Sequence, residues 1–185
     1  MRNFLDRLYS VSLGFAAFSL LVIAALVSVQ IAGRIADAAM GLVGLAPYNL
    51  TILSLSEIAG YLLAGASFLA LAGTLKAGIH VRMTMVIDNL GTTARRIVDL
   101  AGLALGAVFS GYMTWHVAQL VRDSWTFGEV SGGVVAVQLA YPQAVVAIGL
   151  LILTVAFIDE LVITILHGNP SFTAIEQSVS VADGT

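Results

Sequence analysis

The stretch QLAYPQAVVAIGLLILTVAFI, residues 138–158, contains no charged side chain. A helix needs about 20 apolar residues to cross the hydrocarbon core of a bilayer, and an uncompensated charge at mid-depth is costly. Three other stretches are long and apolar enough by the same test, although the second carries Glu57 within its first two turns. The predicted spans are about 8–33, 52–75, 97–121 and 138–165. The sequence therefore predicts an all-α membrane protein with four transmembrane helices.

Composition supports the same class. Of the 185 residues, 59% are hydrophobic and 10% are charged, and the mean hydropathy is +0.98. A soluble domain has about a quarter of its residues charged. The net charge of -3 and the scattered cations offer no basic patch for nucleic acid. The absence of cysteine excludes disulfides, thiolate metal sites and thiol nucleophiles.

One membrane domain, residues 1–168, accounts for most of the chain. The apolar run Val11–Val29 is longer than the core of a cleaved signal peptide, so we expect it to remain as an anchor. Apolar residues at helical spacing predict a short amphipathic helix in the headgroup plane at about 82–95, and a shorter one near the N-terminus. Residues 169–185 are rich in Ser, Thr and acids, which predicts a flexible tail.

The distribution of Lys and Arg predicts the orientation of the chain. Cytoplasmic segments carry an excess of these residues. With four spans, six of the eight fall on the side of the two termini, and only Arg34 and Arg122 fall on the other side. We therefore expect the N-terminus, the tail and the loop between the second and third spans to be cytoplasmic.

Small residues four apart predict close contacts between helices in lipid. The second span has Gly60 and Ala64, and the third has Gly102, Gly106 and Ser110. These positions could hold the four helices to one another or form the seat of another membrane subunit. Sequence spacing alone does not distinguish these two roles.

Glu57 is the only ionisable residue well inside a predicted span. An intramembrane carboxylate is a candidate for ion coupling, substrate binding or a buried pair. A self-sufficient small exporter would use it as its proton site. We favour a partly hydrated group that pairs with Arg34, Arg122 or a backbone donor, or that contacts another subunit, because no other charged group converges with it at mid-depth.

Enzymatic chemistry has no recognisable parts in this chain. It has no phosphate-binding loop, HExxH or GxSxG motif, so we assign no catalytic residue and no metal ligand. A haem-binding anchor of a redox complex would need two histidines facing each other at one depth. Only His116 lies in a span, while His80 and His167 lie outside, so we expect no cofactor.

The segment SWTFGE, residues 124–129, combines aromatic and acidic side chains where the third span ends. Trp125 and Phe127 could belong to an interfacial aromatic belt. Glu129 is better explained by a partner outside the membrane. We therefore regard these three residues as candidates for docking contacts.

Several motifs together resemble a known family, the small, Q-type (DctQ-like) membrane subunit of tripartite ATP-independent periplasmic (TRAP) transporters. The second span has Glu57 followed by Gly60, Tyr61 and Leu62, and the segment after it has Gly78, His80, Val81 and Arg82. The run from Ser124 to Ser131, and Pro142 with Gly149, are also similar to the family. The resemblance extends over nearly the whole chain.

The resemblance implies a bacterial inner-membrane complex with a large (M-type) membrane transport subunit and a periplasmic (P-type) solute-binding protein. Transport would be driven by an ion gradient, commonly sodium, and the solute would be an organic acid. The small subunit would act as a scaffold, surrounded by membrane lipids, and would help to dock the binding protein. It also makes His80 and Arg82 candidates for subunit contacts, together with Glu57.

Overall fold

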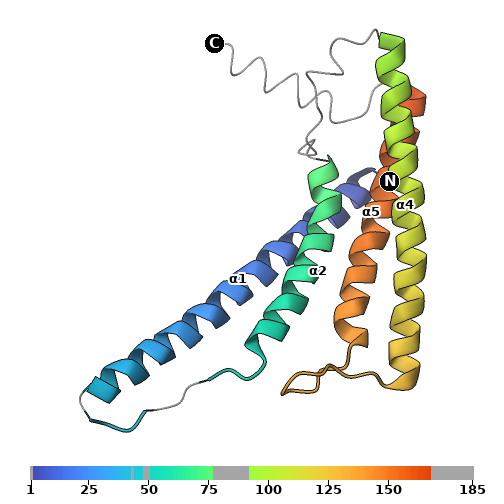
Figure 1. Ribbon diagram of the computed structural model, residues 1–185. Helices are drawn as coiled ribbons and strands as arrows, with labels where there is room; N and C mark the ends of the chain where they lie inside the picture. The colour runs from blue at the N-terminus through green and yellow to red at the C-terminus, as the bar shows by residue number, and fades with distance from the viewer. Residues whose placement is uncertain (1, 43, 48–50, 77–91, 168–185) are drawn as a thin grey trace, which may run out of the picture.

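The computed structural model describes residues 2–42, 44–47, 51–76 and 92–167. These residues form four helices, α1 (Arg2–Leu42), α2 (Leu55–Lys76), α4 (Thr92–Phe127) and α5 (Ala140–His167) (Figure 1). Each contains a segment that is long and apolar enough to cross a membrane. The prediction of an all-α membrane protein with four spans is confirmed.

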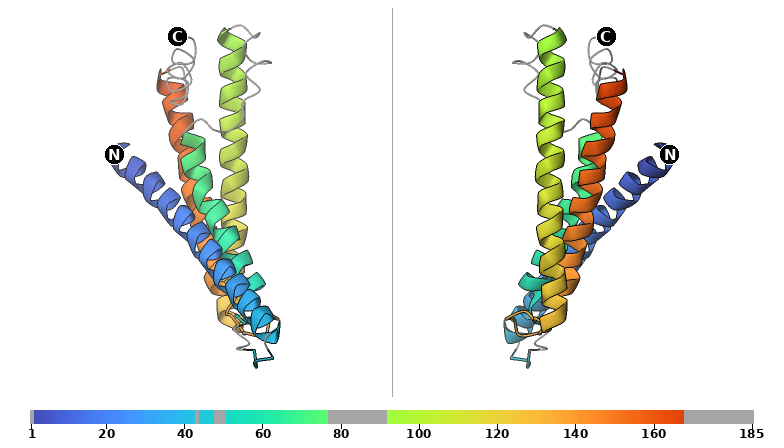
Figure 2. Two further views of the ribbon diagram at one scale, coloured as in Figure 1. Left: turned by 90° about the vertical axis from the view of Figure 1, so that its left-hand side faces the viewer. Right: turned by 90° about the vertical axis from the view of Figure 1, so that its right-hand side faces the viewer.

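The helices are arranged as a row rather than as a closed bundle. The main contacts join α1 to α2, α2 to α5, and α5 to α4. Figures 1 and 2 show that α1 is strongly inclined to the others and that its second half leaves the row. Only 6% of the apolar window of α1 is buried, against 33% of that of α5. Broad apolar flanks are therefore left uncovered by the described residues.

The first half of α1 crosses α2 through small and polar side chains. Tyr9, Ser12 and Ala16 lie one helical turn apart on the same face, and all three are buried. The Ser12 hydroxyl donates to the carbonyl oxygen of Leu69 at 2.6 Å. Because this bond is buried between two helices, it satisfies the hydroxyl and fixes the crossing point.

Glycine allows α2 and α5 to approach closely. A Cβ built on Gly149 would lie 2.7 Å from the backbone carbonyl carbon of Phe68, and one built on Gly65 would lie 2.9 Å from Cγ1 of Val145. Both distances are shorter than side chains tolerate. Helices in lipid associate through such backbone approach, because lipid tails compete equally for apolar side chains.

The contact between α4 and α5 uses glycine and hydroxyl groups. A Cβ on Gly106 would lie 2.5 Å from the ring of Phe157. The hydroxyls of Thr114 and Thr154 are 3.2 Å apart. At the far end, Arg96 donates to the carbonyl oxygen of Ile165 at 3.3 Å. The two helices are thus joined along most of their length.

Helices α1 and α4 extend beyond the predicted spans at both ends, because the flanking polar residues continue the helical backbone, whereas α2 and α5 begin two or three residues later than predicted. Of the predicted interfacial helix at 82–95, residues 82–91 lie outside the described residues, and the rest belongs to the first turn of α4. The predicted tail, 169–185, also lies outside them.

Candidate functional site

One end of the molecule brings together the start of α2, the end of α4, the start of α5 and the loop of residues 128–139 (Figure 1). We call it the loop end. Helix α4 stops at Gly128, which has a φ of +64°, and the amide of Glu129 donates to the Ser124 carbonyl oxygen at 3.0 Å. Glycine in this conformation is a common helix terminator. The 128–139 loop then folds back on itself through an antiparallel bridge between Val130 and Gln138.

Glu57 lies in the first turn of α2, which begins at the loop end. The carbonyl oxygen of Ser54 accepts from the amides of Glu57 and Ile58, each at 3.0 Å. A carboxylate in the first turn of a helix is stabilised by the free amides and the helix dipole. The Tyr61 hydroxyl, one turn further along, donates to Oε1 of Glu57 at 2.8 Å and fixes the side chain.

The other side of Glu57 faces the 128–139 loop. Its Oε2 lies directly against Gly133, where a Cβ would overlap it. The Ser131 hydroxyl carries one proton and lies between two acceptors, the Val135 carbonyl oxygen at 3.3 Å and the Glu57 carboxylate. The amide of Val135 donates to the Ser54 hydroxyl at 3.1 Å. Two segments some 80 residues apart in sequence are thus joined at the loop end.

Two of the partners that we considered for Glu57 were Arg34 and Arg122, while its contact with another subunit stays a prediction. Within the described residues, neither Arg34 nor Arg122 contacts its carboxylate, which is surrounded by hydroxyl groups and a glycine. The reason is geometric. Arg34 lies on the half of α1 that leaves the row, and the side chain of Arg122 is exposed on α4.

The aromatic residues at the end of α4 are exposed. Trp125 and Phe127 project from the last turn, and the Trp125 ring meets that of Tyr141 edge-on with centroids 6.1 Å apart. Glu129 is exposed too, but its carboxylate accepts from the buried Ser124 hydroxyl at 2.7 Å. Glu129 therefore also contributes to the termination of α4.

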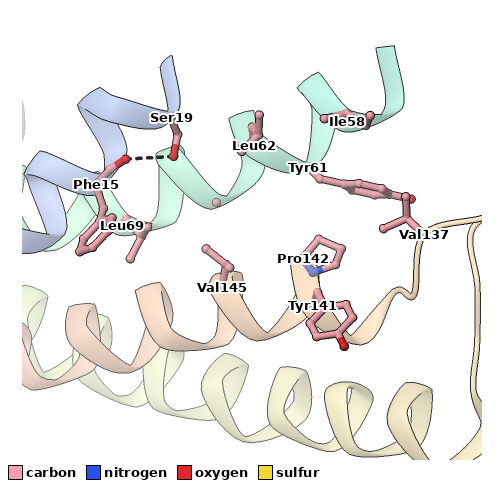
Figure 3. A pocket seen from close by; sticks show the side chains of 11 residues that line it. Phe15, Ser19, Ile58, Tyr61, Leu62, Leu69, Val137, Tyr141, Pro142 and Val145 are labelled. Atoms are coloured by element: carbon pink, nitrogen blue, oxygen red, sulfur yellow. Dashed lines mark hydrogen bonds between the residues drawn. The ribbon is translucent and has the colours of Figure 1, made fainter. Parts of the chain in front are cut away.

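An apolar groove of about 370 Å³ lies between α1, α2 and α5 near the loop end (Figure 3). Tyr61 and Tyr141 lie toward the loop, and Val137 of the 128–139 loop lies beside them. The Ser19 hydroxyl also lines the groove, but it donates to the carbonyl oxygen of Phe15 at 2.9 Å. Because most of its lining side chains are apolar, the groove suits apolar chains rather than a charged solute.

The small residues selected from the sequence fall on different faces. Gly106 packs against α5, and Ser110 is buried. Cβ atoms on Gly60 and Gly102 would meet nothing within 4 Å, and Ala64 lines a second groove toward α4 and α5. Spacing identified small residues but not which of them are covered within this chain.

Three other close approaches were missed as packing positions. They involve Gly65, Gly133 and Gly149, and only Gly149 carried a signal, as part of the family resemblance. Gly65 follows Ala64 directly, and one residue turns the face of a helix by about 100°. The pattern of small residues four apart therefore selected the neighbouring face.

Two candidate contacts and several buried polar residues lie elsewhere. His80 and Arg82 lie outside the described residues. His116 lies on the exposed side of α4, with its ring centroid 4.3 Å from that of Tyr112. Toward the end opposite the loop end, Asp99 and Glu160 are buried, and neither was selected from the sequence because each lies at the edge of a long apolar run.

The fold and the site define a multi-pass helical membrane protein with open apolar flanks and a folded loop at one end. Residues 45–166, about two thirds of the chain, match the family described as "Tripartite ATP-independent periplasmic transporters, DctQ component". The chain belongs to this family, and the resemblance stated from its motifs is confirmed. No curated protein matches the chain.

Proposed function

We propose that this chain is the scaffold subunit of an ion-gradient-driven TRAP transporter that imports an organic acid delivered by a periplasmic binding protein. Family membership supports a small subunit of such a tripartite complex. In this role the chain supports the large transport subunit and helps to dock the binding protein. The solute path and the ion-coupling groups lie in the large subunit.

The main support for the proposal is the way in which the polar side chains within the spans form their hydrogen bonds. A row of helices encloses no central path, and the hydroxyls of Ser67, Thr114 and Thr154 each donate to a carbonyl oxygen of their own helix, four residues back. Transporters place several converging polar groups and broken helices at mid-depth. In the described part of the chain, the helices run through this depth without such a cluster.

The exposed side of α4 is suited to contact the large subunit. Leu105 is 70% exposed, and Phe109 and Tyr112 continue its ridge on the side away from α5. Gly102 lies on the same side with open space in front of it. His116 is also on this side, about five and a half turns from Arg96 and about three turns from Phe127, the two ends of the apolar segment of α4. Polar residues inside a membrane span usually face protein. We therefore infer that a neighbouring subunit, rather than lipid, covers this side of α4.

The loop end is the proposed periplasmic face, since Lys and Arg concentrate on the opposite side. The inner membrane of a bacterium then places both termini in the cytoplasm. Exposed aromatic and apolar side chains, including Phe127 and Val134, are presented at this end. Such residues can anchor a protein interface, while Glu129 at its rim would mainly affect the rate of encounter.

Reconstitution into liposomes tests whether transport requires the large subunit. Proteoliposomes that hold this chain alone, supplied with the binding protein and an inward sodium gradient, should take up no organic acid. Addition of the large subunit should restore uptake, and liposomes with the large subunit but without this chain provide the control. Uptake by this chain without the large subunit would overturn the proposal in favour of a self-sufficient transporter that uses Glu57.

A further inference from the structure

We propose that Ser54 and Glu57 form a latch that holds the 128–139 loop against the start of α2, and that Glu57 is a positioning residue for this loop rather than an ion-coupling group. The consequence for docking rests on the proposed function. The latch itself depends only on contacts within this chain.

Ser54 and Glu57 each contact the 128–139 loop. Ser54 provides its hydroxyl to the amide of Val135, and Glu57 places Oε2 against Gly133. Tyr61 holds the other carboxylate oxygen at 2.8 Å. A carboxylate held on one side by its own helix and covered on the other by a loop has little freedom to exchange ions with water.

The backbone of Ser54 supports a specialised role. Its φ is 56°, a left-handed conformation that is uncommon for residues other than glycine. Such conformations persist where the surrounding structure holds them in place. Here the conformation lets one residue start α2 through its carbonyl oxygen and bind the loop through its hydroxyl.

The sequence of the loop explains why it needs a latch. Gly132 and Gly133 have more backbone freedom than any other pair of residues, so this part of the loop orders itself poorly. Gly133 nevertheless suits this position, because a Cβ there would overlap the Glu57 carboxylate and displace it from the loop. The latch therefore joins a flexible segment, Gly132 and Gly133, to residues held at the start of α2.

The latched loop presents apolar side chains away from the helices. Val134 is 78% exposed, and Val130 and Val135 are also exposed. A surface that is ordered before its partner arrives loses less conformational entropy on binding. The latch would thus raise the affinity for the binding protein without taking part in solute movement.

Ion coupling fits Glu57 less well. The residue is in the first turn of α2, at the loop end of the molecule, and not at mid-depth. A coupling site needs alternating access to the two sides of the membrane, and this carboxylate is covered on one side by the loop. The two interpretations make different predictions for the same substitutions.

Spin labels can measure the order of the loop directly, because the natural chain has no cysteine. In the assembled membrane complex, labels on Cys introduced at Val134 and at the exposed Leu63 of α2 should give a narrow distance distribution. Glu57→Ala should broaden this distance distribution. Ser54→Gly should broaden it too, because glycine permits the same backbone conformation but lacks the hydroxyl. Asp123→Asn removes one charge from the same end outside the latch and should leave it narrow. An unchanged distribution in Glu57→Ala and Ser54→Gly would overturn the latch.

Uptake by the same complexes separates positioning from ion coupling. Glu57→Ala and Ser54→Gly should raise the binding-protein concentration for half-maximal uptake by about fivefold to tenfold, as expected for loss of one ordinary hydrogen bond, with the maximal rate unchanged. Glu57→Gln keeps an acceptor for Tyr61 and should have a smaller effect. Loss of the maximal rate in Glu57→Gln with a narrow loop distribution would overturn the proposal. A broadened loop with unchanged half-saturation would support the latch while refuting the docking role in the proposed function.

Discussion

The substitution Gly149→Ala tests the close approach of α2 and α5. A Cβ at this position would meet the carbonyl carbon of Phe68 at 2.7 Å, its Cβ at 2.8 Å and its carbonyl oxygen at 2.9 Å. Ordinary contacts of a Cβ begin at 3.4 Å. Since two of these atoms are backbone and the third is fixed to it, no rotamer change relieves the overlap. The two helices must separate by about 0.7 Å, the difference between 2.7 and 3.4 Å.

The expected cost is about 1–3 kcal/mol, the usual range for an overpacked interior. The shift also weakens the dispersion contacts around Gly65, which lies on the same interface. For a chain of this size the cost corresponds to a decrease in melting temperature of very roughly 5 °C. The measurement is the thermal loss of monodisperse protein by size-exclusion chromatography in detergent.

Gly60→Ala provides the matched control, because it makes the same chemical change in α2 with nothing within 4 Å of the new methyl group. Alanine is favoured over glycine in helices by about 1 kcal/mol, so this variant should be as stable as the natural chain or slightly more stable. If Gly149→Ala and Gly60→Ala have the same melting temperature, close packing of α2 against α5 does not stabilise this protein and the reasoning fails.

Two further predictions concern orientation and the partner surface. Single cysteines at Ser10 and Val134 should differ in labelling by an impermeant thiol reagent added to intact cells, with only Val134 modified; modification of Ser10 under these conditions would invert the topology. A photoreactive amino acid at the exposed Leu105 should cross-link to the large subunit, whereas one at the buried Leu103 should cross-link only within the chain. If Leu105 yields only lipid adducts, the large subunit does not cover α4.

The membrane class and the approximate spans could be predicted because each depends on local composition. A charge-free run of sufficient length has few alternatives to a transmembrane helix. The order of the helices in the row could not be predicted, because it depends on which face each glycine occupies. Gly106 and Gly102 have equivalent sequence signals, yet one meets Phe157 and the other meets open space.

The candidate site was predicted less completely for a related reason. Glu57 stood out as a lone acid in an apolar stretch, but its surroundings come from a loop almost 80 residues away. The role of Gly133 depends on that fold, and nothing in the local sequence distinguishes it from Gly132. Similarly, Glu129 was recognised as an exposed acid, whereas its hydrogen bond to Ser124 requires the chain reversal at Gly128.

The inclination of α1 has a consequence for the surrounding bilayer. Its charge-free part, residues 8–33, is about 39 Å long at 1.5 Å per residue, whereas the hydrocarbon layer is about 30 Å thick. Hydrophobic mismatch of this size is relieved by a tilt of about 40°. The remaining turns, from Arg34 to Leu42, continue at the same slope through the headgroup region, far from the other helices. We therefore expect the inclined α1 to widen the area that this subunit occupies in the bilayer.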